Sequence, residues 1–329
     1  MASSVPVSSR ELDDTSTLAG RRRGGGGGGG GGRDIRFACS SSALSVFSTT
    51  SMSTSAVVVA RLIDDAFASS GSVPLSHSLS LNALLFYMPR KKLLKMLTPS
   101  GLVHAFALGT MLWTALGWRG WTVCGAYLFL GKTVMKVGFD EKESLGIAEG
   151  LGGRRGPENV WGSALTGAMC TTAAAIAYWI GGVGAGGAFL GLSYDVWSLG
   201  YVVSLSTKLA DTFVSEIGKA YGKTAFLITT LRSVPRGTEG AVSLEGTMAS
   251  GGLLLSVYAY TVVGLLHSPG MVRISTLVTF VARMVESLIG ATLQGREWSR
   301  WMTNEVVNFF NTLLGAFLAM SLGVLVLGM

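Results

Sequence analysis

The sequence predicts an all-α fold: a polytopic integral membrane bundle with about seven helical spans, preceded by a disordered leader. Three observations predict the membrane class. Of the 329 residues, 49% are hydrophobic and only 14% are charged, whereas roughly a quarter of the residues in a soluble domain are charged. The third observation is a series of separate apolar segments, each close to the ~20 residues that a helix needs to cross ~30 Å of hydrocarbon.

Residues 1–75 are predicted to be a transit peptide and low-complexity leader. The first 60 residues are rich in Ser, Thr, Ala and Arg, and they contain the glycine tract Gly24–Gly32 directly after Arg21–Arg23. They lack an apolar run long enough for a secretory signal, and organelle transit peptides have this kind of composition. The Ser-rich stretch 37–59 favours a plastid address over a mitochondrial one. We therefore expect a multi-pass protein of a chloroplast membrane, either the envelope or the thylakoid.

The membrane domain, residues 76–329, contains seven apolar windows long enough to span a bilayer. A shorter apolar stretch, 76–88, is followed by the basic residues of segment 90–95. It is predicted to lie at the interface or to cross half of the bilayer, and the alternative is an eighth span. The seven windows are 98–117, 119–137, 161–180, 187–206, 247–267, 274–293 and 305–328.

Charge is distributed unequally over the connections between these windows. Alternate threading puts the polar loops 138–160 and 207–246 on one face, together with segments 90–95 and 295–304, and leaves short, nearly uncharged turns on the other. The positive-inside tendency would direct the charged face toward the stroma or cytosol. The net charge of +7 is thus explained by the leader and the membrane flanks, and no nucleic-acid partner is expected.

Segment 207–246 carries the candidate catalytic residues. Its first part is predicted to continue the preceding span as a helix, so that Lys208, Asp211 and Lys219 lie on one face. Glu216 flanks that face. Because Mg²⁺ takes one or two protein carboxylates and completes its shell with phosphate and water, Asp211 and Glu216 are predicted to share a magnesium ion. The alternative is a salt-bridged helix at the membrane interface. The catalytic candidates are Lys208, Asp211, Lys219 and Arg232.

Seven further residues are candidates for binding substrate phosphates. Some lie where a helix is predicted to begin, and a helix start attracts anions. The others form a Gly/Thr turn after Arg232, and glycines let backbone amides point at an anion while arginine grips phosphate oxygens. The alternatives are basic membrane anchors and an ordinary surface turn. The candidates are Arg154, Arg155, Asn159, Arg236, Gly237, Thr238 and Gly240.

Polar residues also occur inside or at the start of the last two windows. Arg283 and Glu286 are three residues apart and share a helix face, and we expect a pair that points into the bundle because unpaired charges at that depth are costly. Asn304, Asn308 and Asn311 follow at helical spacing. They are predicted to face the bundle interior, either as contacts between helices or as lining of a head-group site.

Three segments of the chain carry a family resemblance. They read GGRRGPENVWGSALTG, KLADTFVSEIGKAYGKTAFLITTLRSVPRGTEGAVSLEGTMAS, and RMVESLIGATLQG followed by WMTNEVVNFFNTLLGA. In consistent order over about residues 95–328, the chain resembles the plastid phytyl-phosphate kinases of tocopherol (vitamin E) synthesis and their uncharacterised membrane relatives. The resemblance implies transfer of a phosphate from a nucleoside triphosphate, CTP or ATP, to phytyl phosphate. The product would be the phytyl diphosphate used for tocopherol and phylloquinone.

Three alternative functions remain at this point. One is a kinase for another prenyl alcohol or prenyl phosphate. A membrane transporter is the second, although it would show charges near the membrane midplane in two repeats, and the sequence has no convincing repeat. A purely structural membrane protein is the third, and it leaves the charged segment 207–246 without a purpose.

Overall fold

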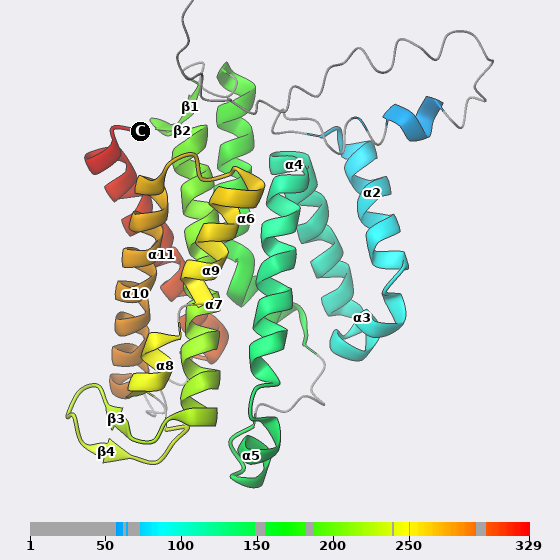
Figure 1. The fold of residues 1–329 in the computed structure, drawn as a ribbon. Coiled ribbons are helices and arrows are strands. Elements are labelled where there is room, and N and C mark those ends of the chain that lie inside the picture. Colours follow the sequence, from blue (N-terminus) through cyan, green and yellow to red (C-terminus); the bar gives the residue numbers. More distant parts are fainter. Residues whose placement is uncertain are drawn as a thin grey trace, which may run out of the picture. The chain divides into compact units, whose positions relative to one another are not determined.

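The computed structural model describes residues 57–61, 64, 73–148, 155–181, 187–238, 240–249, 251–293 and 301–329. Most of the predicted leader lies outside these residues. The described chain is mainly helical (Figure 1). Its helices are α2 (Leu75–Tyr87), α3 (Arg90–Met96), α4 (Pro99–Met135), α5 (Phe139–Ser144), α6 (Pro157–Gly181), α7 (Tyr194–Tyr221), α8 (Leu244–Met248), α9 (Gly251–Tyr258), the π-helix η2 (Ala259–Val263), α10 (Pro269–Thr292) and α11 (Asn304–Leu327).

The helical membrane architecture is confirmed. Among the described residues, five stretches are long and apolar enough to cross a membrane: α4, α6, the run from α8 to η2, α10 and α11. The predicted count of seven additionally requires that both halves of α4 and the more polar α7 cross the bilayer. That count stays a prediction.

Helix α4 is a hairpin of two helical arms. Its 37 residues would extend ~55 Å if straight, well beyond ~30 Å of hydrocarbon. Gly117 interrupts it with φ 61° and ψ −152°, a conformation that glycine tolerates. The rings of Trp113 and Trp121, on opposite sides of this break, are 6.1 Å apart. Asn82 of α2 joins the arms, since its Nδ2 donates to the Phe106 carbonyl (2.8 Å) and its Oδ1 accepts from Trp121 (3.2 Å). The first two predicted windows are these arms.

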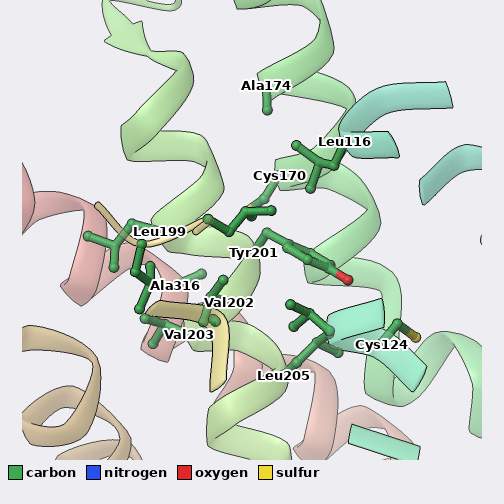
Figure 2. Packing of buried hydrophobic residues seen from close by; sticks show 14 of the residues in the cluster. Leu116, Cys124, Cys170, Ala174, Leu199, Tyr201, Val202, Val203, Leu205 and Ala316 are labelled. Carbon is green, nitrogen blue, oxygen red and sulfur yellow. The ribbon is translucent and has the colours of Figure 1, made fainter. Parts of the chain in front are cut away.

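Helix α7 forms the centre of the bundle and packs against α4, α6, α9, α10 and α11. Leu199, Val202 and Leu205 are at most 1% exposed, and Figure 2 shows them among side chains from the neighbouring helices. The Tyr201 hydroxyl donates to the Gly120 carbonyl at 2.6 Å. Because α7 is enclosed by other helices, its polar residues can be kept away from lipid.

The start of α7 differs from the predicted window 187–206. A short hairpin of β1 (Ala188–Phe189) and β2 (Leu192–Ser193) comes first. Ser193 then caps the helix by accepting from the Val196 amide at 3.3 Å, a favourable N-terminal signal. The hairpin is apolar, so hydropathy alone does not separate it from the helix. Beyond it, α7 runs unbroken through Lys208 and Lys219, as predicted.

The second half of segment 207–246 contains a small antiparallel sheet that the all-α prediction did not include. Strand β3 (Ala225–Leu227) lies between β4 (Ser233–Val234) and β5 (Ala241–Ser243). Gly240 precedes β5 with φ 74°, and a Cβ there would lie 2.5 Å from the Ala291 nitrogen. Only glycine fits this contact, which holds the sheet against the end of α10.

The polar connections meet at one end of the bundle, at the lower side of Figure 1. The Arg155 amide bonds to the last residue of α3 at 3.0 Å. Asn159 of α6 donates to Glu305 of α11 at 2.9 Å, and Arg236 donates to Glu141 of α5 at 3.0 Å. The polar end is hereafter this surface: α3, α5, the β3–β5 sheet, the starts of α6 and α11, and the ends of α7 and α10.

Candidate functional site

Lys208 lies in a buried polar cluster between α7, α10 and α11. Its Nζ donates to Asp211 Oδ2 on the same helix and to Asn308 Oδ1 on α11, each at 2.7 Å. The side chains of Lys208 and Asp211 are only 13% and 14% exposed. An ammonium held by a carboxylate three residues away and by an amide 100 residues away has a fixed position in the bundle.

Helix α10 contributes a second cation and a second carboxylate. Arg283 Nε lies 3.8 Å from Asp211 Oδ1, and Arg283 Nη1 donates to Ser287. Glu286 accepts from Asn311 Nδ2 on α11. The central cluster is hereafter this set: Lys208, Asp211, Arg283, Glu286, Asn308 and Asn311.

The central cluster contains two basic and two acidic side chains. Lys208 and Arg283 are the cations, and Asp211 and Glu286 are the acids beside them. Arg283 is 7% exposed and Glu286 8%. Removing such groups from water is costly unless they are paired, and ionisable residues inside membrane helices usually mark a functional site. Burying four ionisable groups together in the interior therefore costs the protein stability.

Three buried atoms in and beside the cluster make no hydrogen bond to any residue in the described part of the chain: Arg283 Nε, Asn311 Oδ1 and Thr207 Oγ1. A buried polar atom without a partner costs about 1–3 kcal/mol. One is a donor, one an acceptor, and the hydroxyl can be either. These atoms could bind a polar ligand or water.

The central cluster lies a short distance inside the polar end. Asn308 is four residues after the start of α11, Glu286 six before the end of α10, and Asp211 ten before the end of α7. At 1.5 Å per residue, these separations are roughly 6–15 Å. A phosphorylated group that enters from the polar end can thus reach the cluster without crossing the bilayer.

Glu216 does not join Asp211, in contrast to the predicted shared cation site. Its Oε2 lies 2.5 Å from Lys142 Nζ, and its Oε1 lies 3.3 Å from Lys219 Nζ. Five residues on an α-helix correspond to a rotation of about 140°, so Glu216 faces α5 while Asp211 faces α10. The two carboxylates belong to separate networks, and Glu216 already has two cationic partners.

The four catalytic candidates thus separate into two places. Lys208 and Asp211 lie in the central cluster. Lys219 lies at the polar end, 19% exposed and paired with Glu216. Arg232 is exposed in the connection between β3 and β4, where its backbone closes the turn by accepting from the Leu227 amide at 3.0 Å.

The described phosphate-binding candidates are gathered at the polar end. Arg154 lies outside the described residues. Arg155 is exposed, with Nη2 3.5 Å from the Met135 sulfur. Asn159 is bonded to Glu305. The structure brings these two residues to the same end of the bundle as the β3–β5 sheet, but not into the central cluster.

The Gly/Thr turn also lies at the polar end. Arg236 pairs with Glu141 and donates to the Ala220 carbonyl at 3.2 Å. Thr238 Oγ1 donates to the Pro235 carbonyl at 2.8 Å. Its two glycines, Gly237 and Gly240, both have positive φ (85° and 74°). The backbone conformation of the turn is thus sufficient to explain these glycines.

Asn304 does not face the bundle interior as predicted. It is the first residue of α11, next to the cap Thr303, and it is exposed. One turn later Asn308 is 5% exposed, and Asn311 is 2% exposed. The helical spacing of the three asparagines is correct, but the first of them precedes the part of α11 that enters the bundle.

Sequence reasoning missed Lys142. It is 1% exposed and donates from Nζ to the Met135 carbonyl at 2.9 Å as well as to Glu216. In the sequence it appears within the charged run FDEKES of α5, which is typical of a solvated surface helix. Its partner lies 74 residues away, and no local signal indicates such a pairing.

The comparisons with known proteins agree on one family. The family model described as "Integral membrane protein DUF92" matches residues 82–316. An uncharacterized membrane protein of Synechocystis (sll0875) is 49% identical over 79% of this chain and 96% of its own length. Protein VTE6, chloroplastic, of Arabidopsis thaliana is 42% identical over 72% of this chain and 68% of its own length.

A more distant relative is an uncharacterized membrane protein of Methanocaldococcus jannaschii (MJ0933), 25% identical over 66% of this chain and 82% of its own length. No solved structure matches the chain. The family model covers more than half of the sequence, and the first two relatives align along most of it. The chain therefore belongs to the integral membrane protein family DUF92.

Proposed function

We propose that this protein is a membrane-embedded kinase that transfers a phosphate from a nucleoside triphosphate to phytyl phosphate and forms phytyl diphosphate. The observation that carries the proposal is the central cluster, which places Lys208 and Arg283 within the helical bundle, thirteen and nine residues before the polar ends of their helices, or roughly 14–20 Å. Its two cations suit anionic head groups. The resemblance to phytyl-phosphate kinases and the 42% identity to a chloroplastic protein support the same reaction.

Phosphoryl transfer depends mainly on positioning and charge neutralisation. An oxygen of phytyl phosphate bonds to the γ-phosphorus of the donor, the bond to the bridging oxygen breaks, and the nucleoside diphosphate leaves with the electron pair. No proton needs to move, because a phosphate monoester with a second pKa of about 6 is already ionised near neutral pH. Lys208 and Arg283 would hold the acceptor phosphate and offset the charge of the transition state.

The donor would approach from the polar end. Lys219 is 19% exposed there, and Arg232 is exposed nearby in the β3–β4 connection. Both would neutralise nucleotide phosphates. At the same end lie the other described phosphate-binding candidates: Arg155, Asn159, Arg236, Gly237, Thr238 and Gly240. Arg154 remains a candidate from the sequence.

The residues of the central cluster fit a magnesium ion bound together with phosphates. Asp211 and Glu286 offer carboxylate oxygens, and Asn311 Oδ1 is a buried acceptor without a hydrogen bond in the described chain. Within that part, no group of three or more His, Cys, Asp or Glu residues gathers, but Mg²⁺ needs only one or two protein carboxylates. Asp211 and Glu286 would hold it in place of the predicted Asp211 and Glu216. The ion would neutralise charge on the donor phosphates.

The proposed location is a plastid membrane. The printed name of the Arabidopsis relative includes the word chloroplastic, and the composition of residues 1–75 is that of a transit peptide. Phytyl diphosphate made there would serve tocopherol and phylloquinone synthesis. The lipid substrate carries a C20 chain and would stay in the bilayer throughout.

A transporter is the second candidate function. The observation that favours it is the depth of Lys208, which lies 13 residues before the end of α7, because buried charges within spans also mark ion or substrate pathways. Liposomes carrying the protein would then move a prenyl phosphate or an ion without consuming nucleotide.

The test offers purified protein phytol, phytyl phosphate or geranylgeranyl phosphate with labelled CTP or ATP and magnesium. The proposal expects a labelled diphosphate from phytyl phosphate, and Asp211→Asn should abolish turnover while membrane insertion is unchanged. Labelled product from the alcohol alone would assign a different kinase, and transport without nucleotide consumption would replace the kinase with a transporter.

A further inference from the structure

An apolar groove runs alongside the central cluster. It has a volume of about 590 Å³, within the ~300–1,000 Å³ of typical small-molecule sites. Helices α7, α9 and α10 and the end of α8 form it. Its walls include Val214, Leu253, Val272, Leu277, Phe280 and Met284.

Small and large side chains line the groove together. Ala210, Ala249 and Thr276 are among the small ones. Of the larger lining residues, Leu277 is 58% exposed and Phe280 51%. In a bilayer these exposed apolar residues face hydrocarbon, so the groove opens sideways to the membrane. A lipid chain can enter it without passing through water.

One charged residue of the groove belongs to the central cluster. Arg283 lines the groove and is also the partner of Asp211, and its Nε makes no hydrogen bond to any described residue. Val272 and Arg283 are eleven residues apart on α10, which corresponds to roughly 17 Å. This length is close to one leaflet of the ~30 Å hydrocarbon core.

We propose that this groove binds the isoprenoid chain of the prenyl monophosphate, with the phosphate at Arg283 and the chain running along α10 toward Val272. The proposal rests on the proposed function and names the tail subsite of the same active site. Two cations line the groove: Arg273, which is exposed beside Val272, and Arg283, which is buried at the side nearer the polar end. The phosphate is assigned to Arg283 because this residue also belongs to the central cluster and its Nε makes no hydrogen bond to any described residue. Val272 is three residues after the start of α10, so the chain runs from Arg283 away from the polar end, through the half of the bundle that adjoins the opposite surface.

The first test fills the groove and compares two acceptors. Thr276→Phe adds an aromatic ring at a residue that lines the groove, and Val281→Phe adds the same ring on α10 at a position that is 40% exposed and not part of the groove. Thr276→Phe should lower kcat/KM for phytyl phosphate at least tenfold, because pockets discriminate by about 10–200-fold for a single methylene. With a five-carbon prenyl phosphate it should change kcat/KM less than threefold. Val281→Phe should affect neither acceptor.

Equal effects of Thr276→Phe on both acceptors, or no effect on either, would overturn the tail subsite and leave the kinase standing. A second measurement does not depend on turnover. A phytyl monophosphate with a photoreactive diazirine at the end of its chain should label peptides of α9 and α10, and unlabelled phytyl phosphate should compete while phosphatidylcholine should not. Labelling spread evenly over α6 and α11, or removed by phosphatidylcholine, would identify an ordinary lipid contact and reject the proposal. If wild-type protein transfers no phosphate but is labelled at α9 and α10, the kinase fails and the groove stands.

Discussion

Replacing Lys208 with methionine would leave the two carboxylates of Asp211 and Glu286 beside a single cation, Arg283. The central cluster would lose one of its two cations in a place where Asp211 is only 14% exposed. Breaking a buried ion pair by removing one partner costs about 3–5 kcal/mol. We therefore expect Lys208→Met to lower the free energy of unfolding by about that amount. Asn308 would also lose the ammonium that its Oδ1 accepts from at 2.7 Å.

The double variant Lys208→Met/Asp211→Asn distinguishes two causes of lost stability: the unpaired charge and the changed shape of the side chains. It removes the acid together with its cationic partner, so it should recover most of the stability lost by Lys208→Met while phosphate transfer stays absent. Reversible unfolding of wild type, Lys208→Met, Asp211→Asn and the double variant is measured in mixed micelles with rising dodecyl sulfate. The four free energies of unfolding give the coupling energy between Lys208 and Asp211. If the stability losses of the two single variants add up to the loss of the double variant within about 0.5 kcal/mol, the two residues are independent. The ion-pair reasoning is then refuted.

Three further predictions concern the polar end and the metal. Glu216→Gln should lower the free energy of unfolding by about 3–5 kcal/mol, because the buried Lys142, 1% exposed, loses its carboxylate partner. The double variant Glu216→Gln/Lys142→Met should regain stability in the same unfolding assay. Full stability of Glu216→Gln alone would contradict the pairing. Gly240→Ala should cost about 1–3 kcal/mol, since its φ is 74° and the new Cβ would meet Ala291; an unchanged unfolding midpoint would rule out that contact. Chelation by EDTA should stop phosphate transfer and added Mg²⁺ should restore it, whereas an undiminished rate under chelation would exclude magnesium.

The parts of the fold that hydropathy predicts well are isolated apolar helices with clear caps. The windows 274–293 and 305–328 correspond to α10 and α11, which begin after Ser268 and Thr303 as capping residues. Window 187–206 was misplaced because the β1–β2 hairpin is as apolar as the helix that follows it. The β3–β5 sheet was missed because two- and three-residue strands carry too little periodicity to be recognised.

The residues of the candidate site could be predicted from the sequence, but the contacts between them could not. The sequence displays Lys208 and Asp211 at helical spacing and two charges inside an apolar window, so the members of the central cluster could be named. It does not indicate that Asn308 completes the contacts of Lys208. Glu216 was predicted to lie beside Asp211 but pairs with Lys142 and Lys219. The prediction considered the five-residue spacing along the helix and not the rotation of about 140° that five residues produce. Contacts between distant helices depend on packing, which a single sequence does not specify.

The most direct measurement of the central claim is the rate of phosphate transfer to phytyl phosphate in two matched variants. Arg283→Gln removes the cation that the central cluster shares with the groove, and Arg119→Gln makes the same chemical change beside the Gly117 turn of α4, away from the polar end. We predict that Arg283→Gln lowers kcat/KM by about 10²–10³-fold, as expected when one group that stabilises developing charge is lost, while Arg119→Gln stays within about twofold of wild type. Equal rates for Arg283→Gln and wild type would show that phosphate transfer does not occur at the central cluster.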